Sequence, residues 1–127
     1  MEKTVIRTEN APAPFQGAPY NQAIRVGDLV FVAGQLGLKP GDSTIEGDIT
    51  AQTDQVLRNL SAILEEAGSS LANLVKTSVF LQDLGDFAAM NDVYARYVGD
   101  RPPARSTFEV SRLPSGALVE IEAVAHV

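Results

Sequence analysis

The stretch Leu118-Val119-Glu120-Ile121-Glu122-Ala123-Val124-Ala125 alternates between apolar and other side chains over most of its length. Successive side chains of a β-strand point to opposite faces, so this pattern predicts a strand over residues 118–127. One face is uniformly small and apolar and is expected to lie under helices: Val119, Ile121, Ala123 and Ala125. The two glutamates, Glu120 and Glu122, fall on the other face.

A second strand is predicted just upstream, over residues 105–110, after the stiff pair Pro102-Pro103. The turn-rich segment 111–117 joins the two predicted strands. It is too short for a parallel crossover, so we expect an antiparallel hairpin. Arg105 begins the upstream strand, but the hairpin register that would place it opposite one glutamate is not fixed by the sequence.

Hydrophobic periodicity predicts two amphipathic helices before these strands. The first has Asp48 or Thr50 as its N-cap, Gly68 at its C-terminal end, and this apolar face: Val56, Leu57, Leu60, Ile63, Leu64 and Ala67. The second is capped by Asp86, ends at Gly99, and has this face: Phe87, Met90, Val93, Tyr94 and Tyr97. Between the helices, residues 74–81 alternate as a strand, with one face made of Val75, Thr77, Val79 and Leu81.

The N-terminal third is predicted to be strands and loops. Short strands are expected over residues 4–8, 23–26 and 29–33, with Gly27-Asp28 forming a tight hairpin turn. The whole order indicates an α+β fold, in which both helices cover one face of a mixed sheet. The other face would be left uncovered and apolar, which a monomer rarely shows, so we expect an oligomer.

Composition narrows the classes of function. The chain has 127 residues, one domain's worth, with no cysteine and a single histidine, His126. Thiolate nucleophiles and cysteine-zinc sites are excluded, and a Ser-His-Asp triad or a multi-histidine metal site is disfavoured. The formal net charge of −6, with the ten basic residues scattered, argues against nucleic acid as the main partner. No apolar run approaches a membrane span, and the lack of cysteine makes the cytoplasm the default expectation.

Two charged residues are candidates for chemistry. A carboxylate such as Glu120 on a face buried between subunits needs a partner or a role in function. Arg105, a planar guanidinium on a rigid strand start, suits two-point recognition of a carboxylate. The alternative is a structural ion pair of Arg105 with Glu120 or Glu122, or a solvated strand edge. Tyr20 and Gly34 are pocket candidates, although each is also typical of ordinary packing or a turn.

An ordered set of short motifs resembles one known family. They are Gly17-Ala18-Pro19-Tyr20-Asn21-Gln22-Ala23, Val32-Ala33-Gly34-Gln35, Val75-Lys76-Thr77-Ser78-Val79-Phe80-Leu81, the helix pattern Asp83, Phe87, Asn91 and Tyr94, Pro103-Ala104-Arg105-Ser106, and Leu113-Pro114 with Val119-Glu120-Ile121-Glu122-Ala123. The chain is similar in these positions to the RidA (reactive intermediate deaminase) family, also called the YjgF family. Each motif alone is weak, but the order and spacing span nearly the whole chain.

The resemblance implies a single RidA-like domain over residues 1–127, with a chorismate-mutase-like fold that assembles as a homotrimer with sites between subunits. It implies hydrolysis of 2-imino acids, such as 2-iminobutyrate and 2-iminopropionate, to 2-oxo acids and ammonia, without metal or cofactor. Arg105 matches the arginine that binds the substrate carboxylate, and Glu120 matches the acidic residue beside the attacking water. The positions that match substrate-binding residues are Tyr20, Ala33, Gly34, Phe87, Asn91 and Thr107.

Two positions depart from the family pattern. Thr107 stands where many members carry cysteine, and Ala33 where many carry serine. Loss of the serine hydroxyl would change the hydrogen bonding of the pocket and with it the preferred substrate. Two other functions stay open: a ribonuclease or translation inhibitor, because some relatives have been described in this way, and a small-molecule-binding trimer or a deaminase with a different substrate.

Overall fold

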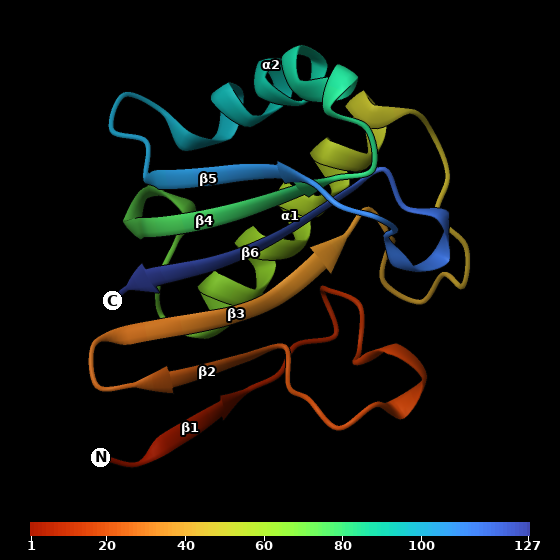
Figure 1. Cartoon of the computed structure of the whole chain (residues 1–127). Coiled ribbons are helices and arrows are strands. Elements are labelled where there is room, and N and C mark those ends of the chain that lie inside the picture. Colours follow the sequence, from red (N-terminus) through yellow and green to blue (C-terminus); the bar gives the residue numbers. More distant parts are fainter.

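A computed structural model describes the whole chain, residues 1–127, as one mixed sheet with two helices. The strands are β1 (Lys3–Ile6), β2 (Ala23–Val26), β3 (Leu29–Leu36), β4 (Leu74–Leu81), β5 (Ala104–Glu109) and β6 (Val119–His126). The helices are α1 (Ile49–Glu66) and α2 (Phe87–Val98). Both helices lie on the same side of the sheet (Figure 1), which confirms the predicted fold class. No helix is both long enough and apolar enough to cross a membrane.

The sheet order β1-β2-β3-β6-β4-β5 contradicts one prediction. β5 and β6 do not form a hairpin: β6 lies between β3 and β4, antiparallel to both, and β5 is an edge strand parallel to β4. The predicted apolar row of β6 is almost fully buried, and two flanking strands satisfy its backbone, so the central position buries more than a hairpin edge would. The helix α2 supplies the crossover that a parallel pair requires.

The side chain of Gln82 holds the chain that connects β5 to β6. Its amide oxygen accepts a hydrogen bond from the Leu113 backbone N–H at 2.9 Å, and its amide nitrogen donates to the Ser111 carbonyl at 3.4 Å. The backbone N–H of Gln82 also bonds the Leu118 carbonyl at 3.1 Å. These bonds fix the return of the chain past the end of β4, on the way into β6.

The predicted helix caps, helix ends and strand faces were mostly confirmed. The Asp48 side chain caps α1 by accepting from the Ala51 backbone N–H at 2.9 Å, and Gly68 has the positive φ of a helix-ending glycine. Asp86 occupies the N-cap position of α2 but makes no side-chain capping bond. Val75 was placed on the wrong face, because a bulge between Leu74 and Lys76 shifts the register and leaves Val75 46% exposed.

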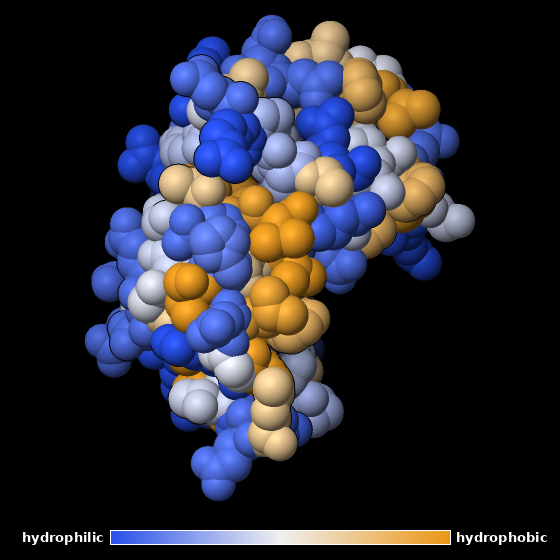
Figure 2. All heavy atoms as spheres, turned by 90° about the vertical axis from the view of Figure 1, so that its left-hand side faces the viewer, coloured by the Kyte–Doolittle hydropathy of each residue, from blue (hydrophilic) through white to orange (hydrophobic).

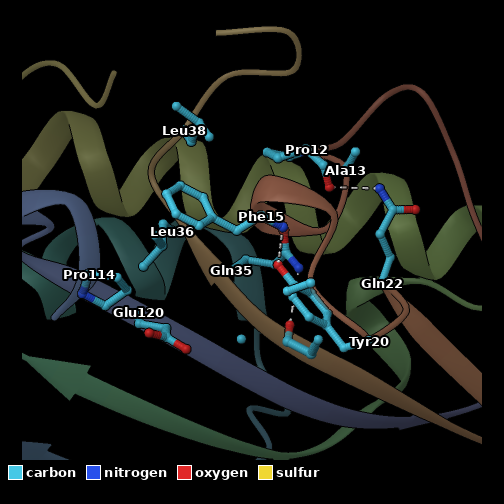
Figure 3. Close-up of a pocket in the computed structure, with 13 residues that line it drawn as sticks. Pro12, Ala13, Phe15, Tyr20, Gln22, Gln35, Leu36, Leu38, Pro114 and Glu120 are labelled. Carbon is cyan, nitrogen blue, oxygen red and sulfur yellow. Dashed lines mark hydrogen bonds between the residues drawn. The ribbon is translucent and has the colours of Figure 1, made fainter. Parts of the chain in front are cut away.

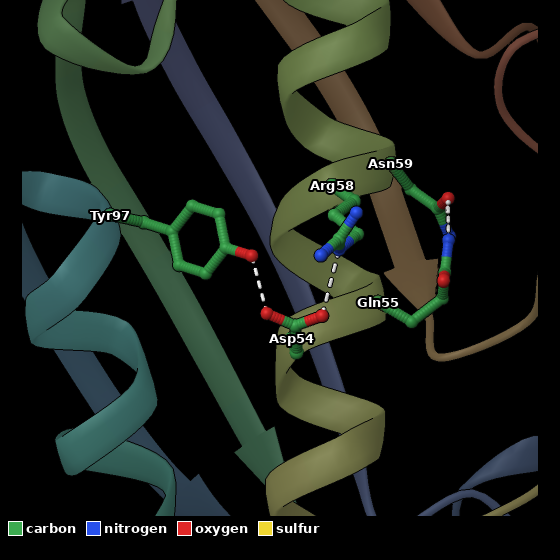
Figure 4. Close-up of polar contacts among 5 residues, drawn as sticks. All are labelled: Asp54, Gln55, Arg58, Asn59 and Tyr97. Carbon is green, nitrogen blue, oxygen red and sulfur yellow. Dashed lines mark hydrogen bonds and ion pairs between the residues drawn. The ribbon is translucent and has the colours of Figure 1, made fainter.

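A polar cluster ties the two helices together on the side away from the sheet (Figure 4). Asp54 of α1 accepts hydrogen bonds from the Tyr97 hydroxyl of α2 and from Arg58 one turn along α1. The Tyr97 hydrogen bond is the main cause that lowers the pKa of Asp54. This cluster contains the one ion pair of the structure, between Arg58 and Asp54.

The sheet face that carries no helix, here called the open face, has an apolar row across four strands. Val5, Ile24, Phe31 and Val124 are successive cross-strand partners in β1, β2, β3 and β6. On β3, Phe31 is 47% exposed and Leu29 is 41% exposed. Phe108 on the edge strand β5 belongs to the same face and is 55% exposed. Seen from the left-hand side of Figure 1, hydrophobic residues gather in a band through the middle of the molecule (Figure 2). Such a surface is typical of one that is covered by another protein chain.

Candidate functional site

Glu120 lies on the open face, where a bulge in β3 makes room for its carboxylate. The register of β3 against β6 shifts between Val32 and Gln35, and Gly34 lies in that shift. A methyl group added at Gly34 would overlap the Glu120 Oε2 atom and would lie 2.9 Å from the carboxyl carbon. The backbone of Gly34 does not have a positive φ, so glycine is needed here for space rather than for conformation.

A cavity of about 460 Å³ opens beside this carboxylate (Figure 3). Four of the residues predicted from the sequence line it: Tyr20, Ala33, Gly34 and Glu120. Glu120 is the one ionisable acid or base among the lining residues apart from the Tyr20 phenol. The structure thus brings one half of the predicted site residues together around a carboxylate.

The loop before β2 forms one wall of the cavity and is held by Gln22, a residue that sequence reasoning did not single out. Gln22 is buried, and its amide nitrogen donates to the carbonyls of Thr8, Ala11 and Pro12 at 2.8–3.2 Å. Its amide oxygen accepts from the Thr8 backbone N–H at 2.7 Å. The only sequence feature that could have indicated that Gln22 holds the loop is its position directly after a segment rich in proline and glycine.

The Tyr20 hydroxyl accepts a hydrogen bond from the Phe15 backbone N–H at 2.6 Å, which fixes the ring at the cavity wall. A phenol can accept and donate at the same time, so the Tyr20 proton remains free for a ligand. Sequence reasoning also missed Phe15 as a lining residue, because nothing in a loop sequence shows which side chains turn inward.

Burial raises the pKa of Glu120, and the negative charge of Glu122 raises it further. The cross-strand neighbours of Glu120 are Leu36 and Phe80, which carry no charge to offset these effects. A carboxylate of raised pKa is a better proton acceptor than an ordinary surface glutamate.

Arg105 lies on the opposite face of the sheet, the one covered by the helices. It is the partner of buried Thr77 in the β4–β5 register. Its guanidinium carbon lies 5.5 Å from the Phe87 ring centre and 4.9 Å from the Tyr94 ring centre. The Tyr94 hydroxyl shares a hydrogen bond of 2.6 Å with the Thr77 hydroxyl, which fixes that ring. Two aromatic faces thus hold the guanidinium without neutralising its charge.

Arg105 forms no ion pair with Glu120 or Glu122 within the chain. It borders a second cavity of about 410 Å³, which Asn91 and Tyr94 also line. The Asn91 Oδ1 and Thr107 Oγ1 atoms are buried without a hydrogen-bond partner. Buried polar atoms are nearly always paired, and the Thr53 Oγ1 atom in α1 is the third exception in this chain.

The predicted site residues therefore form two groups. One contains Tyr20, Ala33, Gly34 and Glu120, and the other contains Phe87, Asn91, Arg105 and Thr107. Arg105 and Glu120 are two strands apart, three residues apart along β4, and on opposite faces. Ordinary strand spacing puts their Cα atoms about 14 Å from each other. One chain alone does not bring the two charges to a single small ligand.

Comparisons with known proteins agree over nearly the whole chain. A family model described as Endoribonuclease L-PSP matches residues 8–127. A RutC family protein of Pyrococcus abyssi is 54% identical over 99% of this chain and 98% of its own length. The chloroplastic Reactive Intermediate Deaminase A of Arabidopsis thaliana is 43% identical over 98% of this chain and 66% of its own length. The crystal structure of RidA from an Antarctic Psychrobacter has a TM-score of 0.93 at 40% identity, covering 98% of this chain and 99% of that one.

Proposed function

This chain belongs to the RidA (YjgF) family, and from that premise we propose that it is a hydrolytic deaminase of reactive 2-imino acids and their enamine forms. Its products would be 2-oxo acids and ammonia, with 2-iminobutyrate and 2-iminopropionate among its substrates. The observation that carries the proposal is the Arg105 guanidinium, which borders a cavity without a carboxylate partner of its own. The carboxylate of a substrate would supply the anionic partner that Arg105 lacks within its own chain.

The proposed reaction uses few protein groups, because the carbon of an imine is already electrophilic. Arg105 holds the substrate carboxylate in two parallel hydrogen bonds and orients the C=N bond. Glu120 accepts a proton from water as the water oxygen bonds to the imine carbon and the C=N pair moves to nitrogen. Return of that proton to nitrogen gives a carbinolamine, with a hydroxyl and an amino group on the same carbon. Glu120 then takes the hydroxyl proton and passes it to nitrogen, and the C–N bond breaks to release ammonia as the C=O bond forms.

A coupled assay tests this function. A threonine dehydratase generates 2-iminobutyrate in place, and the release of 2-oxobutyrate is followed with and without the protein. The proposal expects faster release in proportion to the protein added. An unchanged rate over a range of protein concentrations would contradict the deaminase assignment.

We expect the working unit to be a homotrimer, with each site between two chains. The exposed apolar row on the open face supports this, because another chain would bury it. The separation of Arg105 from Glu120 also supports it, because a second chain could bring the two side chains to one site. Light scattering coupled to gel filtration should give about three times the chain mass of 13.5 kDa. A monomer at micromolar concentration would remove the basis for a shared site.

Gly34→Ala is expected to lower kcat/KM for imine hydrolysis roughly 100-fold, because the added methyl displaces the Glu120 carboxylate. The fold should survive, since the carboxylate can swing away from the new atom. Gly85→Ala is the matched control, made in a turn where the nearest atom to the new methyl is a side-chain oxygen of Asp83. Steady-state kinetics and a melting curve on both variants check this, and equal kinetics would show that Glu120 does not need its present position.

A ribonuclease is the second candidate, because the matching family model carries that description. The net charge of −6 and the position of His126, exposed and away from both cavities, weigh against it. The test is RNA cleavage by protein from a nuclease-free preparation, beside the Arg105→Ala variant. Cleavage by the wild type that this variant loses would favour the second candidate.

A further inference from the structure

The helix α1 carries three polar side chains on the face that packs against the sheet, where apolar residues fill most of the core. They are Gln52, Thr53 and Asn59, and each is at most 4% exposed. The amides of Gln52 and Asn59 are hydrogen-bonded, whereas the Thr53 hydroxyl has no partner. Burying an amide is costly unless it is hydrogen-bonded, so the partners of Gln52 and Asn59 indicate what these two residues do.

Asn59 holds the chain where it leaves β3. Its amide nitrogen donates to the carbonyls of Leu36 and Leu38 at 3.1 and 2.8 Å. Its amide oxygen accepts from the side chain of Gln55 at 2.9 Å, which fixes the orientation of the amide (Figure 4). Leu36 is the cross-strand partner of Glu120, and the two form the last pair of the β3–β6 ladder at this end. The helix therefore supplies hydrogen bonds at the point where the ladder ends.

Gln52 holds the chain where it enters β6. Its amide oxygen accepts from the Leu118 backbone N–H at 2.9 Å, two residues before Glu120. Its amide nitrogen donates to the Gly47 carbonyl at 2.9 Å. A methyl group added at Gly37 would lie 2.8 Å from the Gln52 Cα atom, so the chain leaving β3 also packs directly against the helix here. The same helix thus fixes both the exit from β3 and the entry to β6.

These two amides can influence the Glu120 carboxylate only through the backbone. Gln52 and Asn59 do not line the cavity, and α1 covers the sheet face opposite to the open face (Figure 1). The last pair of a ladder opens more readily than an inner pair, because fewer hydrogen bonds hold it closed. Glu120 belongs to such a pair, and its carboxylate lies in close contact with Gly34 of the facing strand.

We propose that Gln52 and Asn59 are positioning residues for Glu120. By bonding the backbone at the end of β3 and just before β6, they keep the last pair of the ladder closed and hold the carboxylate at the cavity. The kinetic consequence rests on the proposed deaminase function. The position of Glu120 can be tested without turnover.

Gln52→Met replaces the amide with an apolar side chain of similar length and removes both of its hydrogen bonds. It is expected to lower kcat for imine hydrolysis about 10- to 100-fold, because a small misplacement of a reacting group has an effect of this size. The affinity for 2-oxobutyrate, measured by isothermal titration, should stay unchanged because Arg105 is not disturbed. Added to Glu120→Gln, the same substitution should cause little further loss of rate, because Gln52 acts through Glu120. Asn59→Leu is the second variant, should Gln52→Met fail to fold.

Thr53→Val is the matched control, made at the next residue of the same helix. The side chain is equally buried, and the substitution removes a hydroxyl that bonds nothing. It should keep the wild-type kcat. Val93→Ala, in the buried face of α2, controls for stability and should lower the melting temperature while leaving kcat unchanged below it. If Gln52→Met behaved like Val93→Ala, with full kcat in the folded protein, the proposal would be overturned.

An NMR titration of ¹³C-labelled glutamate carboxyl groups reports on Glu120 directly. Burial is the main cause that raises the pKa of Glu120, and the charge of Glu122 adds to it. A carboxylate released toward solvent in Gln52→Met should therefore have a lower pKa, while Thr53→Val should leave the pKa unchanged. An unchanged pKa in Gln52→Met would also overturn the proposal. A lowered pKa in a protein whose wild type hydrolyses no imine would instead overturn the deaminase function and leave the positioning role intact.

Discussion

Arg105→Lys is expected to lower kcat/KM for imine hydrolysis by roughly 30-fold to several thousand-fold, corresponding to the loss of about 2–5 kcal/mol from a buried charged pair. Lysine keeps the positive charge but not the planar fork that would hold a carboxylate in two parallel hydrogen bonds. It also cannot lie flat between the rings of Phe87 and Tyr94, which position the guanidinium. Arg105→Ala should be at least as severe.

The measurements are steady-state kinetics, melting temperature and oligomer mass on the same preparation. Product oxo acids should bind the wild type and not detectably bind either variant. A purely structural Arg105 would give the reverse pattern: a lower melting temperature or a looser oligomer, with full turnover in whatever trimer remains. That pattern would show that Arg105 forms a structural ion pair with Glu120 or Glu122 and does not bind the substrate.

Glu120→Gln is expected to keep the fold and the oligomer and to slow hydrolysis by roughly 10²–10⁴-fold, the range for loss of a general acid–base group. Glutamine has nearly the same shape and fits beside Gly34, but it cannot accept the proton of the attacking water. Wild-type turnover in this variant would assign Glu120 to structure alone.

Glu122→Gln is the matched control on the same strand, with a smaller expected effect on the rate. It also tests the electrostatics of the site. The active form of Glu120 is the ionised one, so activity falls as pH drops through its pKa, which burial and Glu122 hold above the ordinary value. Removing the Glu122 charge lowers the pKa of Glu120, and the acid side of the pH profile should move to lower pH. An unmoved profile would mean that another group titrates there.

The two inactive variants together reveal whether the site is shared. If Arg105 and Glu120 of one site come from different chains, trimers refolded from an equal mixture of Arg105→Ala and Glu120→Gln chains contain about one intact site in four. The mixture should then regain about a quarter of the wild-type activity, while each variant alone stays inactive. No recovery in verified mixed trimers would place both residues in one chain's site.

Prediction from the sequence succeeded where the controlling physics is local. The apolar face of α1, its Asp48 cap and its Gly68 end follow from helix periodicity and from backbone groups within one turn. The Gly27-Asp28 hairpin follows from a glycine that adopts the positive φ of a tight turn. The inward face of β6 follows from the two-residue period of a strand. Where a bulge breaks that period, at Val75, the prediction was wrong, because the pattern carries no mark of an inserted residue.

The residues of the candidate site were likewise predicted only in part. The residue types and their order indicated Arg105, Glu120 and their companions. The structure places all of them except Phe87 at a cavity or at a buried unpaired polar atom, and Phe87 lies against the Arg105 guanidinium. Sequence reasoning missed Gln22 and three apolar residues that line the cavity beside Glu120, namely Phe15, Leu36 and Leu38. Side chains so far apart in the chain share a surface only through the packing of whole elements, which short patterns do not encode.

The sequence by itself determined the helices, most strands, the buried faces and the chemistry that the chain carries. Only the tertiary structure decided that β6 lies between β3 and β4 and that β5 runs parallel to β4 at the edge. The reason is that strand order is chosen by the total burial and hydrogen bonding of the sheet, and the length of one connection constrains it only weakly. In that arrangement Arg105 lies on the helix side of the sheet and Glu120 lies on the open face. One chain alone therefore cannot bring both side chains to the same small ligand.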